Sequence, residues 1–223
     1  MNQPFTNRLL VVGTPIWESQ YVHPFILGIG SGFLDLEKFK FWVRQDYLFL
    51  VEYSKVFAFA AGRVDDLSVT KRLLGLAQST LETELDLHVS YAREFGIDVS
   101  ELEHEEKSPV CQAYTDFLIR TSLTGSFGEI ASALLPCMWG FSEIGKRLEA
   151  DGLPRDERYA RWIQMYTGEA FLSLADWCRE LVDEAAKGQP QIELDRMEKA
   201  FLISSRYELM FWEMAWNQEN WPV

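Results

Sequence analysis

Hydrophobic residues recur along most of the chain at intervals of three and four, the spacing that places them on one face of an α-helix. Alternation of apolar and polar residues with a period of two, which would indicate strands, is short and rare. About eight helices are expected, over the approximate ranges 5–27, 35–61, 69–95, 108–121, 127–150, 157–166, 169–186 and 192–216. The pattern therefore predicts an all-α protein, a helical bundle.

Glycine and proline residues mark the ends of several of these segments. Gly62 and Gly96 follow the second and third predicted helices, and Pro109 opens the fourth at the favoured first-turn position. The charged segment 101–107 is expected to be a loop. All the connections are short, so residues 1–223 are expected to form a single domain.

Composition narrows the class of ligand. Of the 223 residues, 48% are hydrophobic and 14% are aromatic, which predicts a globular protein with a large core and a ring-lined pocket. The chain has 21 basic and 34 acidic residues, a net charge of −13. Nucleic acids and anionic membranes require basic surfaces, so both are disfavoured as partners, and a small neutral or cationic substrate remains open.

The same sequence favours a cytoplasmic protein. No apolar stretch approaches the roughly 20 residues that span a bilayer, and the first residues lack the basic start of a signal peptide. The three cysteines, Cys111, Cys137 and Cys178, are odd in number and form no Cys-x-x-Cys pair. They are expected to be free thiols in a reducing compartment.

Two carboxylates interrupt helix faces that are otherwise apolar. Asp46 lies in an aromatic stripe with Trp42 and Phe49, and Glu208 shares a face with Phe211 of the last helix. Burying a carboxylate is costly unless it is paired or hydrogen-bonded. Each acid is thus a candidate functional group, the alternative being a structural ion pair with a Lys or Arg of another helix.

Cys137 is the third candidate, because Pro136 directly precedes it inside a predicted helix. A mid-helix proline removes a hydrogen bond and bends the helix, which would angle the thiol toward a cavity. The alternative is a cysteine that serves only as a small hydrophobic residue. Tyr114 and Tyr166 also lie on apolar faces, where a buried hydroxyl requires a partner but is often only structural.

A metal site is a weaker possibility. Glu84 and His88 are four residues apart on one predicted helix, and residues 101–104 form a Glu-x-x-His motif that ends at His104. A carboxylate-bridged di-iron bundle requires two such motifs on facing helices, and the second lies here in the predicted charged loop. No metal is therefore expected, although a metal-dependent oxidase that uses Glu84 and His88 remains an alternative.

Five segments together resemble the TenA family, also called thiaminase II or aminopyrimidine aminohydrolases. Their order and spacing agree over essentially the whole chain, and the Leu-Pro-Cys-x-Trp and Tyr-Glu-x-x-Phe-Trp elements are the most specific. The segments are QDYLFL at 45–50, Ser108-Pro109 with Tyr114, ALLPCMW at 133–139, WIQMY at 162–166 and YELMFWEMA at 207–215, and the start His23-Pro24-Phe25 fits as well. Cys137 is retained, which places the chain with the Cys-containing branch of the family.

The resemblance implies a heme-oxygenase-like helical bundle without heme, usually a homotetramer, and no metal or organic cofactor. It implies hydrolysis of 4-amino-5-aminomethyl-2-methylpyrimidine to the hydroxymethylpyrimidine and ammonia, in thiamine salvage, and cleavage of thiamine itself to pyrimidine and thiazole. The implied catalytic residues are Cys137, Glu208 and Asp46. The implied substrate-binding residues are Asp46, Phe49, Tyr114, Phe141, Tyr166, Trp212 and Glu208.

The residue types suit that chemistry. Cys137 is the implied nucleophile that adds to ring carbon C6, and Glu208 suits proton donation to a ring nitrogen because burial favours the neutral acid. Asp46 is expected to accept a hydrogen bond from the exocyclic amino group. The tyrosines would complete the polar rim, while Phe49, Phe141 and Trp212 would enclose the ring.

Two positions depart from the family pattern. Many relatives have tyrosine where this chain has Phe49 and Phe141, so two hydroxyl groups are missing. This departure keeps open a third hypothesis, a non-catalytic protein that binds a pyrimidine without turning it over.

Overall fold

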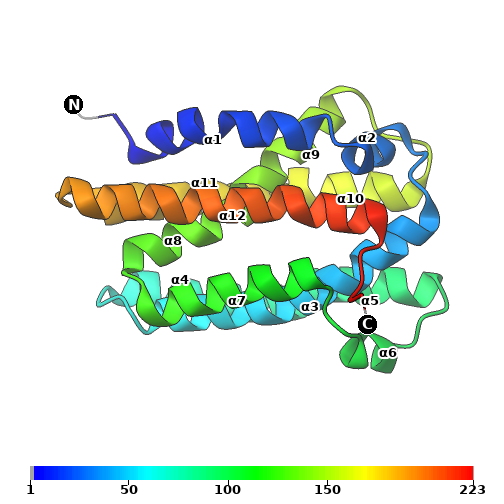
Figure 1. Ribbon diagram of the computed structural model, residues 1–223, viewed down its shortest axis with the longest axis horizontal. Coiled ribbons are helices and arrows are strands. Elements are labelled where there is room, and N and C mark those ends of the chain that lie inside the picture. Colours follow the sequence, from blue (N-terminus) through cyan, green and yellow to red (C-terminus); the bar gives the residue numbers. More distant parts are fainter. Residues whose placement is uncertain (1–2, 223) are drawn as a thin grey trace. The chain divides into compact units, whose positions relative to one another are not determined.

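The computed structural model describes residues 3–222, and within that range the regular structure is entirely helical (Figure 1). The segments Thr80–Glu84 (η1) and Pro136–Gly140 (η2) are π-helical and join the α-helices on either side without a break. The α-helices are α1 Phe5–Tyr21, α2 Pro24–Ser31, α3 Leu36–Ala61, α4 Leu67–Ser79, α5 Leu85–Glu94, α6 Val99–His104, α7 Pro109–Thr124, α8 Phe127–Leu135, α9 Phe141–Ala150, α10 Glu157–Thr167, α11 Glu169–Ala186 and α12 Gln191–Asn217.

The all-α prediction is confirmed, with a small correction in number. Because α4–η1–α5 and α8–η2–α9 are each continuous, the twelve α-segments make ten helices in the described residues, where about eight were expected. The first predicted helix is two helices, since Pro24 starts α2 and His23 caps it by accepting a hydrogen bond from the Phe25 amide. The predicted charged loop, residues 101–107, includes the end of the short helix α6. Asp98 and Glu101 form a capping box at the start of this helix.

Two compact units make up the chain, and one of them is built around α3. This unit comprises residues 35–127 and 214–222, and in it α3 packs against α4, η1, α5, α6 and α7. Asp35 caps the start of α3 and Gly62 follows its end. The helix is buried on most of its circumference, as its lack of a polar face predicts.

The other unit comprises residues 3–34 and 128–213. In it α1 packs against α11, α9 against α10, and α2 against both α9 and α10. Helices α8 and α12 approach closely at Gly128, where a Cβ atom would lie only 2.7 Å from the Met197 sulfur. Figure 1 shows α8 and α12 running in the same direction.

Gly32 ends α2 in the left-handed conformation, with φ of 77°. A Cβ atom there would lie 3.0 Å from Cβ of Pro154. We expect Gly32→Ala to destabilise the protein by about 1–2 kcal/mol, the cost of a left-handed non-glycine residue. Denaturant unfolding measures the change. Gly75→Ala in α4, where a Cβ would meet nothing within 4 Å, is the matched control and should be neutral or stabilising.

Candidate functional site

Cys137 lies in the π-helical turn that interrupts the helix from Phe127 to Ala150. Pro136 opens this turn, since it has no amide hydrogen to continue the α-helical pattern. In the same turn, the Trp139 ring contacts the Trp17 ring edge to face, at 4.9 Å between ring centroids. The bend expected at Pro136 is thus a π-turn, a feature that is frequent at functional sites.

The packing of α8 and α9 against α12 defines the position of Cys137. Ser204 Oγ donates a 2.6 Å hydrogen bond to the Ala133 carbonyl oxygen, and the rings of Phe141 and Trp212 lie 5.2 Å apart. Cys137 follows Ala133 by four residues and precedes Phe141 by four.

On α12, Glu208 stands in the same relation to Ser204 and Trp212, four residues after the first and four before the second. Because the two helices run in parallel, contacts one turn before and one turn after place Cys137 level with Glu208. Both residues are buried, with exposed fractions of 8% for Cys137 and 4% for Glu208. A buried thiol and a buried carboxyl group therefore stand at matching positions of two helices that pack together in this unit.

Aromatic rings lie one turn beyond this pair. Phe141 lies 4.8 Å from Tyr166 and 5.2 Å from Trp212 between ring centroids, and Trp162 lies 4.7 Å from Tyr166. Three of the predicted substrate-binding residues, Phe141, Tyr166 and Trp212, thus form one cluster. Trp162 belongs to the same cluster, although the sequence had pointed to it only as part of the WIQMY segment.

Two residues near the N-terminus fix Trp212. Its indole nitrogen donates a 2.9 Å hydrogen bond to Gln20 Oε1, and its ring stacks on Phe25 at 5.6 Å. Gln20 is a supporting residue that sequence reasoning missed. A glutamine on a mostly apolar helix carries no signal of its partner, which is 192 residues away along the chain.

Asp46 belongs to the other unit, where it pairs with a histidine. His88 Nε2 of α5 lies 2.7 Å from Asp46 Oδ2, and the two side chains are 1% and 7% exposed. The contact is an ion pair and not an aligned hydrogen bond, because the ring N–H does not point directly at the oxygen. The alternative had named a Lys or Arg of another helix as the partner of Asp46, whereas the side chain at this distance is a histidine of α5.

A second acid adjoins this pair. The Glu84 residue is partly exposed, but its carboxyl group is enclosed, and burial together with the nearby Asp46 raises its pKa to about 7. Burial alone would lower the pKa of His88, but the Asp46 carboxylate outweighs it and raises that pKa above its ordinary value. The three side chains form an enclosed charged cluster on α3, η1 and α5.

Phe49 and Tyr114 lie together in the same unit, with ring centroids 4.9 Å apart and both residues buried. Phe49 follows Asp46 by one turn of α3. Cys111 lies one turn before Tyr114 on α7, and burial raises the pKa of its thiol to about 12. Cys111 is therefore too poorly ionised to act as a nucleophile.

The predicted residues thus form two groups. Cys137, Glu208 and the rings of Phe141, Tyr166 and Trp212 belong to one unit. Asp46, Phe49 and Tyr114 belong to the other, together with His88 and Glu84.

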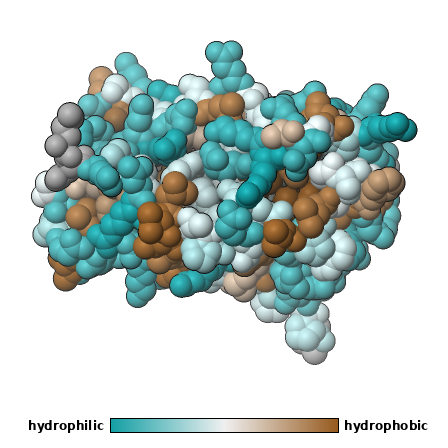
Figure 2. Space-filling model, turned by 90° about the horizontal axis from the view of Figure 1, so that it is seen from above, coloured by the Kyte–Doolittle hydropathy of each residue, from teal (hydrophilic) through white to brown (hydrophobic). Residues whose placement is uncertain are grey.

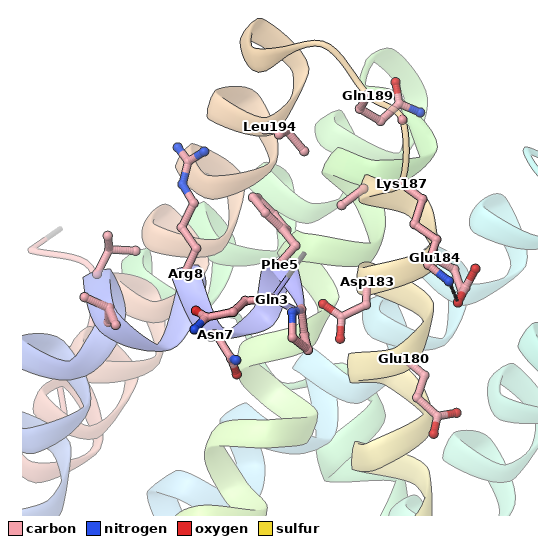
Figure 3. A pocket seen from close by; sticks show the side chains of 15 residues that line it. Gln3, Phe5, Asn7, Arg8, Glu180, Asp183, Glu184, Lys187, Gln189 and Leu194 are labelled. Carbon is pink, nitrogen blue, oxygen red and sulfur yellow. Dashed lines mark hydrogen bonds and ion pairs between the residues drawn. The ribbon is translucent and has the colours of Figure 1, made fainter. Parts of the chain in front are cut away.

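A surface hollow in the unit of residues 3–34 and 128–213 is lined by neither group. Its volume is about 900 Å³, and residues of α1 and α11 and the start of α12 line it (Figure 3). Two of its polar side chains make structural contacts: Asp183 accepts hydrogen bonds from the Thr6 amide and hydroxyl, and Arg8 pairs with Asp195 and Glu198. No predicted site residue lines this hollow.

Among residues 3–222, no three His, Cys, Asp or Glu side chains are arranged to hold a metal ion. In the same range, no helix combines the length and the apolar character needed to cross a membrane.

The fold itself has known counterparts. A solved structure from Shewanella denitrificans, described as a domain of unknown function with a heme oxygenase-like fold, superposes with a TM-score of 0.75 at 13% identity, over 96% of this chain and 92% of that one. The protein is therefore an all-α protein with a heme-oxygenase-like fold.

Closer similarity identifies the family. The solved TenA homologue from P. horikoshii OT3 superposes with a TM-score of 0.89 at 30% identity, over 96% of this chain and 99% of that one. An aminopyrimidine aminohydrolase of Halalkalibacterium halodurans is 39% identical over 218 residues, 97% of each chain. One of Bacillus subtilis is 38% identical over 206 residues, 92% of this chain and 86% of that one. The model of the TENA/THI-4/PQQC family matches residues 13–218, and the chain belongs to this family.

Proposed function

We propose that the protein is an aminopyrimidine aminohydrolase of thiamine salvage. Its substrate is 4-amino-5-aminomethyl-2-methylpyrimidine, and its products are the hydroxymethylpyrimidine and ammonia. Two relatives that match over most of their length carry the name aminopyrimidine aminohydrolase. The observation that carries the proposal is the register that sets Cys137 level with Glu208 on parallel helices.

The proposed reaction requires a nucleophile and an acid on the same ring. The Cys137 thiolate adds to ring carbon C6 while Glu208 protonates a ring nitrogen, so that the ring becomes electron-rich. Those electrons expel the aminomethyl nitrogen, which is protonated as an ammonium group, so that it leaves as ammonia. Water then adds to the exposed methylene carbon and releases one proton to solvent. The ring nitrogen returns its proton to Glu208, and the C6–sulfur bond breaks to regenerate the thiolate.

The remaining residues hold the substrate in this proposal. Asp46 accepts a hydrogen bond from the exocyclic amino group. Tyr114 and Tyr166 supply hydroxyl groups at the rim, and the rings of Phe49, Phe141 and Trp212 enclose the pyrimidine. Burial of all five aromatic residues supports this role, because a site that excludes water strengthens charge interactions.

An ammonia-release assay tests the proposal. Purified protein is incubated with the aminomethylpyrimidine and, in parallel, with thiamine, and ammonia and hydroxymethylpyrimidine are quantified in equal amounts. Tight pyrimidine binding without turnover would overturn the proposal in favour of a non-catalytic binding protein. Iron or manganese at one equivalent per chain would favour the metal-dependent oxidase.

Phe49→Tyr should raise kcat/KM for the aminomethylpyrimidine by roughly 3–10-fold, since one hydrogen bond contributes about 0.5–1.5 kcal/mol. The new hydroxyl restores a donor that many relatives have one turn from Asp46. Steady-state kinetics of ammonia release measures the gain. Phe57→Tyr, elsewhere on the same buried face of α3, is the matched control and should bring no gain. Equal or lower kcat/KM in Phe49→Tyr would contradict the role given to this position.

We also propose that the chain is one TenA-like domain that assembles as a homotetramer in the cytoplasm. The family model spans residues of both units, and the three cysteines are buried and form no disulfide in the described residues, as suits a reducing compartment. Large apolar side chains lie exposed, among them Phe33 at 89% and Val11 at 73%. Figure 2 shows such hydrophobic side chains gathered in groups on one face of the molecule. Sedimentation equilibrium measures the assembly, and a monomer at micromolar concentration would contradict it.

A further inference from the structure

His88 has both ring nitrogens against acceptors. Nδ1 lies 2.8 Å from the Glu84 carbonyl oxygen, which can only accept a hydrogen bond, so Nδ1 carries a proton. Nε2 lies 2.7 Å from the Asp46 carboxylate. An ionised carboxylate at that distance favours a proton on Nε2 as well. Both contacts therefore favour the protonated ring, and the pKa of His88 is raised above its ordinary value because the Asp46 carboxylate and Glu84 outweigh the opposite effect of burial.

The position of this ring is fixed on its other side. The Trp42 ring lies 5.3 Å from the His88 ring, between centroids, and comes from α3, the helix that carries Asp46. The Glu84 carbonyl belongs to the last residue of the π-turn η1. Contacts with the Trp42 ring and with the Glu84 carbonyl oxygen thus hold the His88 ring against Asp46, and only 1% of the His88 side chain is exposed.

We propose that His88 is a positioning residue that orients Asp46 to accept a hydrogen bond from the 4-amino group of the pyrimidine. The inference rests on the proposed function and assigns to the Asp46–His88 pair the choice between 4-amino and 4-oxo pyrimidines. An ionised carboxylate accepts from an amino group and repels the lone pairs of a carbonyl oxygen.

The Glu84 carboxyl group lies close to this pair. Burial together with the nearby Asp46 raises the pKa of Glu84 to about 7. His88 and the Thr80 hydroxyl are the other groups that face Glu84. Of the two carboxyl groups, Asp46 is the one that His88 contacts through Nε2, at 2.7 Å.

The test compares ligand binding in the Cys137→Ser background, where turnover does not interfere. Calorimetry measures the affinity for 4-amino-5-hydroxymethyl-2-methylpyrimidine and for its 4-oxo analogue. His88→Gln keeps a donor of similar size but removes the charge. We expect it to weaken binding of the 4-amino compound about 10–100-fold, the range for a charge-assisted hydrogen bond, and to leave the 4-oxo compound unchanged or bound more tightly.

His104→Gln is the matched control. His104 also contacts a backbone carbonyl four residues earlier, with Nδ1 2.7 Å from the Ser100 oxygen, but it lies exposed on α6. It should leave both affinities unchanged. An equal loss for both ligands in His88→Gln would show a merely structural role and overturn the inference.

A double-mutant cycle tests whether His88 acts through Asp46. Asp46→Asn combined with His88→Gln should bind the 4-amino compound no more weakly than Asp46→Asn alone, whereas additive losses would overturn the inference. ¹⁵N spectra of the unchanged chain at about pH 8 should show His88 protonated on both ring nitrogens, although an unperturbed histidine titrates near 6.5. A neutral ring would equally overturn it.

The failures of the two proposals are distinguishable. Binding without any ammonia release refutes the proposed function and leaves the binding experiment on His88 decisive. Ammonia release with no selective loss in His88→Gln refutes only the inference. Absence of pyrimidine binding by the unchanged chain refutes both.

Discussion

Cys137→Ser should lower kcat for ammonia release at least about 100-fold, which corresponds to about 2.7 kcal/mol of transition-state stabilisation. Serine fits the space of the thiol, but its hydroxyl stays protonated near neutral pH and is a far weaker nucleophile toward the ring. The substrate-binding residues are unchanged, so the affinity for the hydroxymethylpyrimidine should stay within about threefold. Steady-state assays and calorimetry measure the two quantities.

Cys178→Ser is the matched control, because Cys178 is a buried cysteine of the same unit, 6% exposed, on α11. It should retain nearly full activity. A Cys137→Ser variant that turns over at the rate of the unchanged chain would refute covalent catalysis. Thermal unfolding of both variants separates a lost nucleophile from a lost fold.

Glu208→Gln should lower kcat by at least about 100-fold as well, the scale for removing a positioned proton donor. Glutamine matches glutamic acid in size, and Ser204 and Trp212 hold the turns of α12 on either side. The loss should therefore affect proton transfer and not packing. The pH–rate profile of the variant should differ from that of the unchanged chain, because the proposed proton donor is missing.

Glu198→Gln provides the comparison on the same helix. Glu198 pairs with Arg8 at 2.6 Å near the start of α12, so its replacement should leave the pH–rate profile as it is. If Glu208→Gln kept the profile of the unchanged chain, Glu208 would not be the proton donor.

The residues of α3 show which properties can be predicted from local sequence and which cannot. The spacing of Trp42, Asp46 and Phe49 predicts one aromatic helix face with an acid inside it, and all three residues are buried as expected. The spacing does not name the partner of the acid. His88 is 42 positions away on α5, and the sequence suggested a metal role for it, because Glu84 and His88 are also spaced as ligands on one helix.

The π-turns show a second limit of prediction from local sequence. Pro136 predicts an interruption in its helix, because the missing amide is a local property. The turn at Thr80–Glu84 contains neither proline nor glycine, and no local pattern predicts it. In the folded chain this turn packs against α3, which is distant in sequence.

Local patterns along the chain predict the helical class, most helix boundaries and the three residues that are unusual on apolar faces, Asp46, Cys137 and Glu208. These properties depend on neighbours within about four positions, where helix periodicity and capping act. The folded chain adds two pairings that these patterns do not contain: Cys137 is level with Glu208, and Asp46 pairs with His88. Those pairings depend on how helices distant in sequence pack, and the free energy of packing is a sum over many side chains that no short segment contains.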